Sequence, residues 1–307
     1  MKKVLITGAT GFVGMHLVEL IDFPRCVVRK QEPHQFSDFY EIDSLETTTD
    51  WSLAFDDVEA IVHLAGIAHM RDVNEATYRK VNKEGTLCLA KEAVKAGVKR
   101  FVFVSSIGVN GTVTHDAPFS IDTIAKPHNS YTQSKYDAEV GLRKIAEDTG
   151  LEVVIIRPTL VYGPDAPGNF GMLTKLVNKL PILPFGLANN QRDFIAVQNL
   201  ADLLVTCTWS PDAAGYTFLA NDGETVSTKE FTDMIARGLG KNVVQLPIPT
   251  SFMRLAGKLT GKSAMIEQLV GNLQVDSSNL KSVLNWTPPL TMKQAMATLR
   301  NSGNEQE

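Results

Sequence analysis

Three glycines at intervals of three residues follow directly after a short apolar run, residues 3–6, at the N-terminus. The residues after the third glycine have the spacing of a helix. Glycines between a strand and a helix permit a tight turn, a close approach of the backbone to a pyrophosphate, and close packing of the helix on the strand. The helix start also offers free N–H groups to that anion. The pattern predicts a dinucleotide-binding turn, and the alternative is an ordinary glycine-rich turn. The residues expected to bind the dinucleotide here are Gly8, Thr10, Gly11, Phe12, Val13 and Gly14.

Further apolar runs continue this pattern along the first half of the chain. Continuous β-branched and aromatic runs are typical of strands buried on both faces of a parallel sheet. Segments with helical spacing separate them, and strands that alternate with helices indicate a doubly wound sheet. The sequence therefore predicts an α/β fold of the Rossmann type. The expected strands are 26–28, 60–64, 101–104 and 153–156, and the clearest helices are 77–96 and 135–146.

The pattern changes after Pro158. Glycine, proline and asparagine crowd residues 163–190 around one expected helix, 172–179, and proline-marked loops follow towards the C-terminus. We predict a nucleotide-binding domain and a smaller C-terminal substrate-binding cap. The first would comprise residues 1–165, with 194–222 returning to it, and the cap would comprise 166–193 and 223–307.

Composition and charge exclude several classes of function. The net charge of -4 is spread along 307 residues, which argues against a nucleic-acid surface. No apolar run reaches the roughly 18 residues of a membrane span. The three cysteines, Cys26, Cys88 and Cys207, are far apart and lack zinc-site spacing, as expected of free thiols in a reducing compartment. We therefore expect a cytoplasmic protein that binds neither a structural metal nor a membrane.

The end of the second expected strand bears on the choice of cofactor. Folds that bind NAD usually place a carboxylate there for the ribose 2′-hydroxyl. This chain has Arg29 and Lys30 instead. A guanidinium can bind a 2′-phosphate through paired hydrogen bonds. The sequence thus favours NADP(H), whereas NAD(H) remains possible if Arg29 is a solvated surface charge.

A tyrosine and a lysine four residues apart suggest proton-transfer chemistry. On a helix, this spacing would place Tyr131 and Lys135 on one face. A free tyrosine has a pKa of about 10, and a nearby ammonium can lower it enough for acid–base work at neutral pH. Ser105 and Ser106 end the strand 101–104, at the edge where ligands of such sheets bind. We expect Ser106 to bond the reacting oxygen and Ser105 to cap the next turn.

Taken together in this order, the motifs carry a family resemblance. The chain resembles extended short-chain dehydrogenases/reductases, in particular the NAD-dependent epimerase/dehydratase family that acts on nucleotide sugars. The similarity extends over nearly the whole chain. Besides the glycine turn, the matching segments are 63–66, 81–82, 105–106 with Gly111, 131–135, 157–158, 161–164 and 192–195.

The resemblance implies a role for each matching residue. Tyr131 would be the acid–base, Lys135 would bind the nicotinamide ribose, Ser106 would assist at the substrate oxygen, and Asn82 would support their network. Asn169 would contact the nucleotide sugar. Arg192 would bind its diphosphate, with a local salt bridge to Asp193 as the alternative. His63 would be structural. Further contacts with the dinucleotide would come from Asp43, Leu64, Ala65, Gly66 and Pro158.

Family members differ in the reaction that follows hydride transfer. Ile107 and Gly108 follow Ser106 where a dehydratase of this kind carries an acidic pair, so water elimination is not expected. Arg29 and Lys30 favour a reductase that uses NADPH, and the resemblance points to the C4 keto group of a UDP-4-keto-6-deoxy-(N-acetyl)hexosamine. The alternatives are a UDP-sugar 4-epimerase with tightly bound NAD and a non-catalytic nucleotide sensor. A homodimer is also expected, as in many relatives, through a four-helix interface formed by the helices 77–96 and 135–146 of two subunits.

Overall fold

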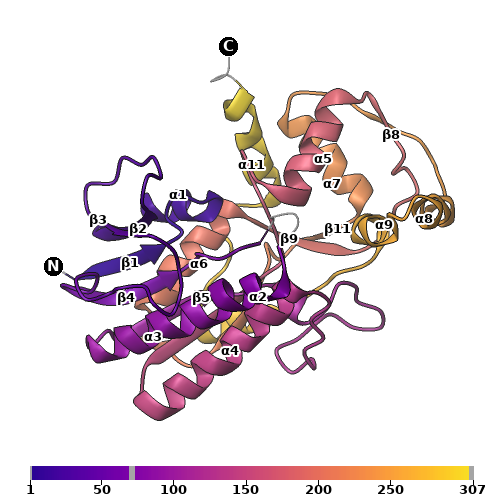
Figure 1. The fold of residues 1–307 in the computed structure, drawn as a ribbon. Helices are drawn as coiled ribbons and strands as arrows, with labels where there is room; N and C mark the ends of the chain where they lie inside the picture. The colour runs from indigo at the N-terminus through magenta and orange to yellow at the C-terminus, as the bar shows by residue number, and fades with distance from the viewer. Residues whose placement is uncertain (1, 69–72, 304–307) are drawn as a thin grey trace.

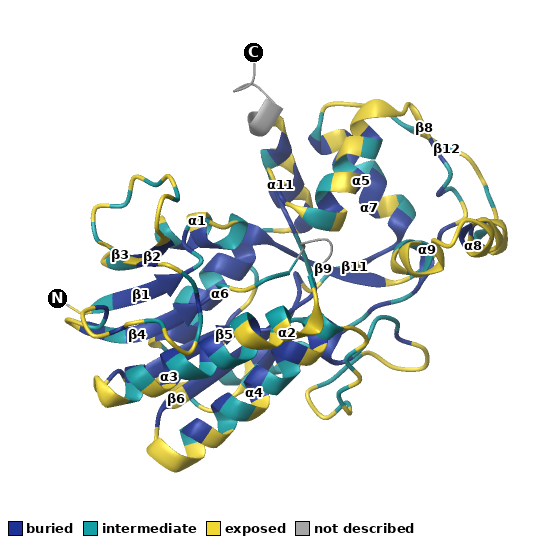
Figure 2. Ribbon diagram, viewed as in Figure 1, coloured by how far each residue is buried: buried dark blue, intermediate teal, exposed yellow. Residues whose placement is uncertain are grey.

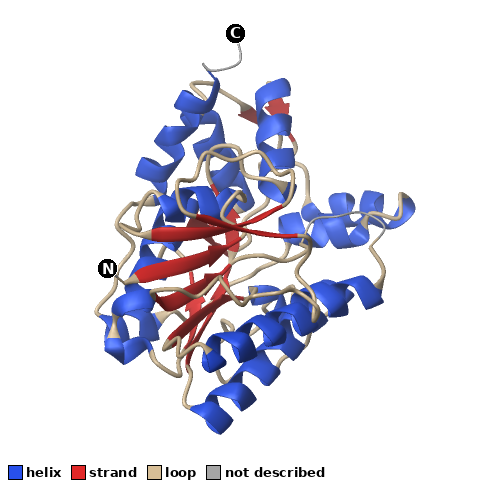
Figure 3. Ribbon diagram, turned by 60° about the vertical axis from the view of Figure 1, so that its left-hand side comes forward, coloured by secondary structure: helices blue, strands red, loops and turns tan. Residues whose placement is uncertain are grey.

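The computed structural model describes residues 2–68 and 73–303, and its larger part is a parallel sheet covered by helices (Figures 1 and 3). All seven strands of this sheet are parallel, in the order β10-β6-β5-β4-β1-β2-β3. The order reverses between β1 and β4, which opens a crevice at their carboxyl ends. The strands are β1 (Lys3–Thr7), β2 (Pro24–Arg29), β3 (Phe39–Ile42), β4 (Val58–His63), β5 (Arg100–Val104), β6 (Glu152–Pro158) and β10 (Thr217–Ala220).

Successive residues of one strand pack into two different cores. Val4 and Ile6 of β1 face the core that contains α6 (Val197–Trp209), whereas Leu5 faces the core that contains α3 (Thr86–Lys95) and α4 (Ser130–Thr149). Helices therefore cover both faces of the sheet, and its central strands are largely buried, whereas the edge strand β3 is partly exposed (Figure 2). The predicted doubly wound α/β fold is confirmed. The other helices of this part are α1 (Phe12–Val18), α2 (Glu75–Tyr78) and the short turns η2 (Ile107–Val109) and η3 (Pro211–Ala213).

The five strands expected from the sequence are present, but the helix expected over 77–96 is not uniform. Between α2 and α3 the chain forms a π-helical segment, η1 (Arg79–Gly85). The helix α4 begins earlier than expected, because Asn129 and Thr132 form a capping box at its start. It ends at Gly150, whose φ of 78° is in the left-handed region that stops a helix.

A smaller cap with its own core packs at the carboxyl edge of the sheet (Figure 1). The segment between its parts returns to the sheet, since α6 and β10 both pack in the first core. The helix α10 (Ser278–Leu284) also contributes Leu280 to that core. The remaining elements are β7 (Leu160–Tyr162), α5 (Gly168–Lys179), β8 (Ile182–Leu183), β9 (Arg192–Ala196), β11 (Thr225–Val226), α7 (Thr228–Gly238), β12 (Val244–Gln245), α8 (Thr250–Leu259), α9 (Ser263–Val270), α11 (Met292–Ala297) and η4 (Thr298–Gly303).

The three cysteines are free thiols, and Cys26 and Cys207 are buried. Among residues 2–68 and 73–303, no cluster of histidine, cysteine and carboxylate side chains could hold a metal ion. Within those same ranges, no helix combines the length and the apolar character needed to cross a bilayer.

Candidate active site

A cavity of about 720 Å³ lies between the carboxyl edge of the sheet and the cap. Such a volume is within the usual range for cofactor and ligand sites. Its lining combines residues of the glycine turn, the strand ends and the cap. The predicted site residues that line it are Gly8, Gly11, Phe12, Val13, Gly14, Leu64, Ser106, Tyr131, Pro158, Asn169 and Arg192. Thr10, Arg29, Lys30, Asp43, Ala65, Gly66, Asn82 and Lys135 lie outside this lining.

The glycine turn leaves no room for side chains at two of its positions. Gly8 has a φ of 73°, and a Cβ there would lie 2.8 Å from the Ala65 nitrogen. A Cβ on Gly14 would lie 2.1 Å from the Gly8 oxygen. Glycine is therefore required for the turn and for the packing of α1 on β1. The floor of the cavity is bare backbone at this point, as a pyrophosphate site requires.

A carboxylate that the sequence did not single out stands at the end of β2. Glu32 accepts a hydrogen bond from Thr10 Oγ1 at 2.8 Å and pairs with Arg29 Nη2 at 3.2 Å. These contacts hold the pKa of Glu32 below its usual value, the bond from Arg29 being the largest cause. Lys30 in turn pairs with Asp43 at 2.9 Å. Both cations expected to bind a 2′-phosphate thus have carboxylate partners, and Asp43 is largely exposed.

Tyr131 and Ser106 meet in the cavity, with Lys135 behind them. Burial raises the pKa of Tyr131 to about 12, against a smaller lowering by a hydrogen bond with Ser106. Lys135 Nζ donates to the Val104 carbonyl at 2.9 Å and lies 4.7 Å from the ring centre of Phe103. Burial lowers the pKa of Lys135 to about 8, which the negative charge of Glu139 partly offsets. Burial outweighs the hydrogen bond with Ser106, and Lys135 is not among the causes of the shift in the Tyr131 pKa. The part expected of Lys135 in tuning the phenol, together with an oxidised nicotinamide, stays a prediction.

The structure gives the turn cap expected of Ser105 to Ser106 instead. Ser106 Oγ, rather than Ser105, caps the turn η2 by accepting from the Gly108 nitrogen at 3.1 Å. Ser105 Oγ donates to Glu139 Oε1 at 2.6 Å. The prediction that Ser105 caps the turn was wrong, because its side chain points to a buried carboxylate that the sequence alone did not locate. Ser106 still faces the cavity beside Tyr131.

The π-helical segment η1 carries Asn82 to a supporting position. Its side chain exchanges hydrogen bonds with the backbone of Ile67, at 2.7 and 2.9 Å, and donates to Ser134 Oγ at 3.0 Å. A Cβ on Gly66 would lie 3.0 Å from Asn82 Oδ1 and 3.4 Å from Lys135 Nζ. Asn82 thus links α4 to the loop after β4. π-helical turns are often found at functional sites.

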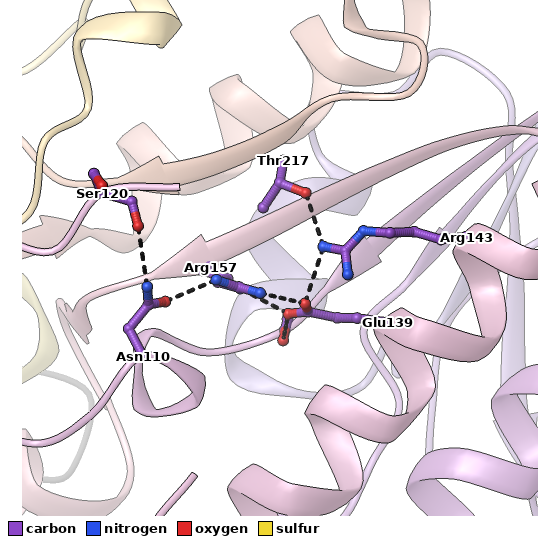
Figure 4. Close-up of polar contacts among 7 residues, drawn as sticks. Asn110, Ser120, Glu139, Arg143, Arg157 and Thr217 are labelled. Atoms are coloured by element: carbon purple, nitrogen blue, oxygen red, sulfur yellow. Dashed lines mark hydrogen bonds and ion pairs between the residues drawn. The ribbon is translucent and has the colours of Figure 1, made fainter. Parts of the chain in front are cut away.

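A buried charge network lies beneath these groups (Figure 4). Glu139 of α4 is fully buried and pairs with Arg157 of β6, whose Nε donates to it at 2.9 Å. Arg157 also donates to Asn110 Oδ1 at 2.9 Å. Arg143, which is partly exposed, pairs with Glu139 at a distance of 3.2 Å. The network fastens α4, which bears Tyr131, to the strand ends beside the cavity.

Arg192 brings an unpaired positive charge to the cap side of the cavity. It is 7% exposed, and burial lowers its pKa to about 10. Its Nη1 donates to the Gly271 carbonyl at 2.9 Å, but no carboxylate pairs with it in the part of the chain that the structure describes. Asp193 makes no salt bridge with Arg192, and its carboxylate accepts from Asn221, Thr225 and the Val275 nitrogen. Its negative charge still partly offsets the lowering of the Arg192 pKa by burial. Asn169 pairs with Gln268 at 3.0 Å on the same wall.

His63 has the structural role expected of it. Its ring bonds Thr7 Oγ1 at 2.6 Å and Thr86 Oγ1 at 2.8 Å. Burial lowers the pKa of His63 to about 3, with the charge of Lys135 as a smaller cause. The ring is therefore neutral and joins β1, β4 and α3.

Comparison with known proteins agrees with this architecture. A family model described as the NAD dependent epimerase/dehydratase family matches residues 4–217. The chain is 42% identical over 304 residues to a UDP-glucose 4-epimerase of Vibrio cholerae, covering 95% of this chain and 93% of the relative.

Two solved structures show the same fold. A UDP-glucose 4-epimerase of Thermotoga maritima, solved with UDP-glucose, superposes with a TM-score of 0.77 at 21% identity and covers 99% of both chains. RMD of Pseudomonas aeruginosa, solved with NADPH, superposes with a TM-score of 0.75 at 22% identity, covering 98% of this chain and 99% of that one. With its ordered motifs and parallel sheet, the chain belongs to the NAD-dependent epimerase/dehydratase family.

Proposed function

We propose that this protein is a UDP-sugar 4-epimerase that keeps one NAD bound through its catalytic cycle. The observation that carries the proposal is the Glu32 carboxylate, held against the glycine turn by Thr10. A carboxylate at this place bonds a ribose 2′-hydroxyl and repels a 2′-phosphate. The similarity to the Vibrio cholerae UDP-glucose 4-epimerase supports the same choice. The support that Arg29 and Lys30 give to an NADPH-dependent reductase is reduced, because each cation has a carboxylate partner in an exposed ion pair.

The residues present fit a nicotinamide dinucleotide. The crowded backbone around Gly8 and Gly14 forms a cradle for a pyrophosphate. From there the cavity runs past Leu64 and Pro158 to Tyr131. When bound, oxidised NAD supplies the hydride acceptor and a positive charge that lowers the pKa of a nearby phenol.

The chain's own groups would handle the proton and orient the sugar. Tyr131 would take the proton from the sugar C4 hydroxyl and return it after the keto sugar has turned over. Its hydrogen bond with Ser106 would place both hydroxyls at that oxygen. Lys135 would hold the ribose, since its ammonium is buried beside Gly66 and fixed by the Val104 carbonyl.

Arg192 would bind the diphosphate of the nucleotide sugar. Burying a charge that has no counter-charge costs several kcal/mol of desolvation free energy. An anion bound in the cavity would offset that cost for the Arg192 guanidinium. The guanidinium can offer a forked pair of donors to a phosphate. Asn169 and Gln268 extend the same wall towards the sugar.

The proposal is tested by the nucleotide that purifies with the protein. Protein purified without added cofactor is denatured, the released nucleotide is separated by chromatography, and native protein is assayed with UDP-galactose alone. We expect NAD near stoichiometric amounts and formation of UDP-glucose. An empty site with no conversion until NADPH and a 4-keto sugar are added would overturn the epimerase in favour of the reductase.

A further inference from the structure

The helix α8 carries apolar side chains on a side that no part of the chain covers. Phe252, Leu255 and Leu259 are 64%, 53% and 79% exposed. Their spacing places them on one stripe of the helix. The buried residues of α8, Met253 and Gly257, lie on another side, where Gly257 packs closely against Ile266 of α9. Two faces of this short helix are thus apolar, and one of them is exposed at the outer end of the cap (Figure 2).

The strand pair that leads into α8 is also apolar and exposed. Val244 and Ile182 are register partners in β12 and β8 and are 61% and 49% exposed. Leu246 follows two residues after Val244 and is 42% exposed. Isolated exposed apolar residues are ordinary, whereas a group of them within one part of a surface marks an interaction site.

The charge of this region has the opposite sign to that of the whole chain. Residues 166–191 and 241–271 contain six basic residues and one acidic residue, in a chain of net charge -4. The acidic residue, Glu267, already pairs with Arg254. On α8 and directly after it, Lys258 and Lys262 have no ion pair among the described residues. Lys175, Lys179 and Lys241 lie farther off, on α5 and just before β12, where Asp233 of α7 contacts Gln245. The basic residues are Lys175, Lys179, Lys241, Arg254, Lys258 and Lys262.

We propose that the outer cap is a docking surface for an anionic phospholipid bilayer, with the α8 stripe inserted at the interface. An exposed apolar stripe flanked by lysines is the pattern of helices that lie in the plane of a membrane surface. The positive charge complements anionic headgroups. It disfavours a second copy of the chain on the same face, because two such faces would repel each other. This role goes beyond the proposed catalytic function and does not depend on it.

The docked orientation would place the substrate cavity near the membrane. The helix α9 packs against α8 and supplies Met265, Gln268 and Leu269 to the lining of the cavity.

Vesicle flotation tests the proposal with the full-length protein. The vesicles contain either one part phosphatidylglycerol to two parts phosphatidylcholine or phosphatidylcholine alone. The test variant is Phe252→Ser/Leu259→Ser, and the matched control is Leu53→Ser/Ile124→Ser, whose residues are 69% and 79% exposed elsewhere. We expect wild type and control to float with the anionic vesicles. The test variant should bind these vesicles at least about tenfold more weakly. Raised salt should weaken wild-type binding, and neutral vesicles should retain little protein.

Three outcomes would overturn the proposal. One is no binding of wild type to anionic vesicles, and another is equal binding by the two double variants. The third is a wild-type dimer by light scattering that only the α8 variant loses, which would assign the stripe to a second copy. Conversion of UDP-galactose in solution should be the same in wild type and both variants, so a failure of the proposed function is recognised separately.

Discussion

Replacing Glu139 with alanine should remove a large part of the stability of this protein. Glu139 is fully buried and accepts hydrogen bonds from Ser105, Arg157 and Arg143. Its loss would leave the Arg157 guanidinium, whose side chain is 5% exposed, without a counter-charge. Removing one partner of such a buried pair typically costs about 3–5 kcal/mol. A domain has about 5–15 kcal/mol of unfolding free energy in total, so the variant should be close to its stability limit.

Two further variants separate the buried pair from the surface charge near it. Arg143 is 42% exposed, so Arg143→Ala should cost about 0–1 kcal/mol, the usual worth of an exposed ion pair. Replacing both partners, as Glu139→Leu/Arg157→Met, should recover much of the loss, because no unpaired charge remains.

The assay is equilibrium unfolding in urea, followed by the fluorescence of the three tryptophans. We expect the unfolding free energies to rank wild type, Arg143→Ala, the double variant and Glu139→Ala, from highest to lowest. A loss below about 1 kcal/mol for Glu139→Ala would refute the reasoning, because that is the range of an exposed pair. A double variant less stable than Glu139→Ala would do so too.

Three other predictions concern the site and the assembly. Tyr131→Phe should lower kcat roughly 10²–10⁴-fold, the usual worth of general acid–base catalysis, and near-normal turnover would remove Tyr131 from that role. Glu32→Ala should weaken NAD binding roughly 10- to 100-fold, as expected for a lost hydrogen bond to a charged group. NADP binding should stay the same or become tighter, because the carboxylate that repels the 2′-phosphate is gone; equal weakening of both in fluorescence titrations would place Glu32 away from the ribose. Val140 is 49% exposed on α4, so Val140→Asp should turn the expected α3–α4 homodimer into a monomer on size-exclusion chromatography. An unchanged elution volume would contradict that interface.

The sheet could be predicted from the sequence because each central strand is a continuous apolar run. The run over residues 101–104 is fully buried at Phe101, Val102 and Phe103. The strand β3 has the burial pattern of an edge strand, with Phe39 and Glu41 exposed, so its mixed composition gave no clear signal. The π-helical turn at η1 has no sequence signature beyond a helical pattern, although it positions Asn82.

The partners of charged side chains were the least predictable part of the site. Arg29 and Lys30 suggested a phosphate site, but folding pairs each of them with a carboxylate. Glu32 is three residues past β2, so its bond to Thr10 depends on how the chain turns after the strand. Likewise, Glu139 is one helical turn beyond Lys135, a spacing that fits the buried side of α4, yet its partner Arg157 comes from a distant strand.

The central claim is that one bound NAD takes the hydride from sugar C4 and returns it to the same carbon. UDP-galactose carrying deuterium at C4 is incubated with the purified protein without added nucleotide, and the product is examined by mass spectrometry and NMR. We expect UDP-glucose that keeps the deuterium at C4. Product formed only after NADPH is added, or product that has lost the label, would contradict it.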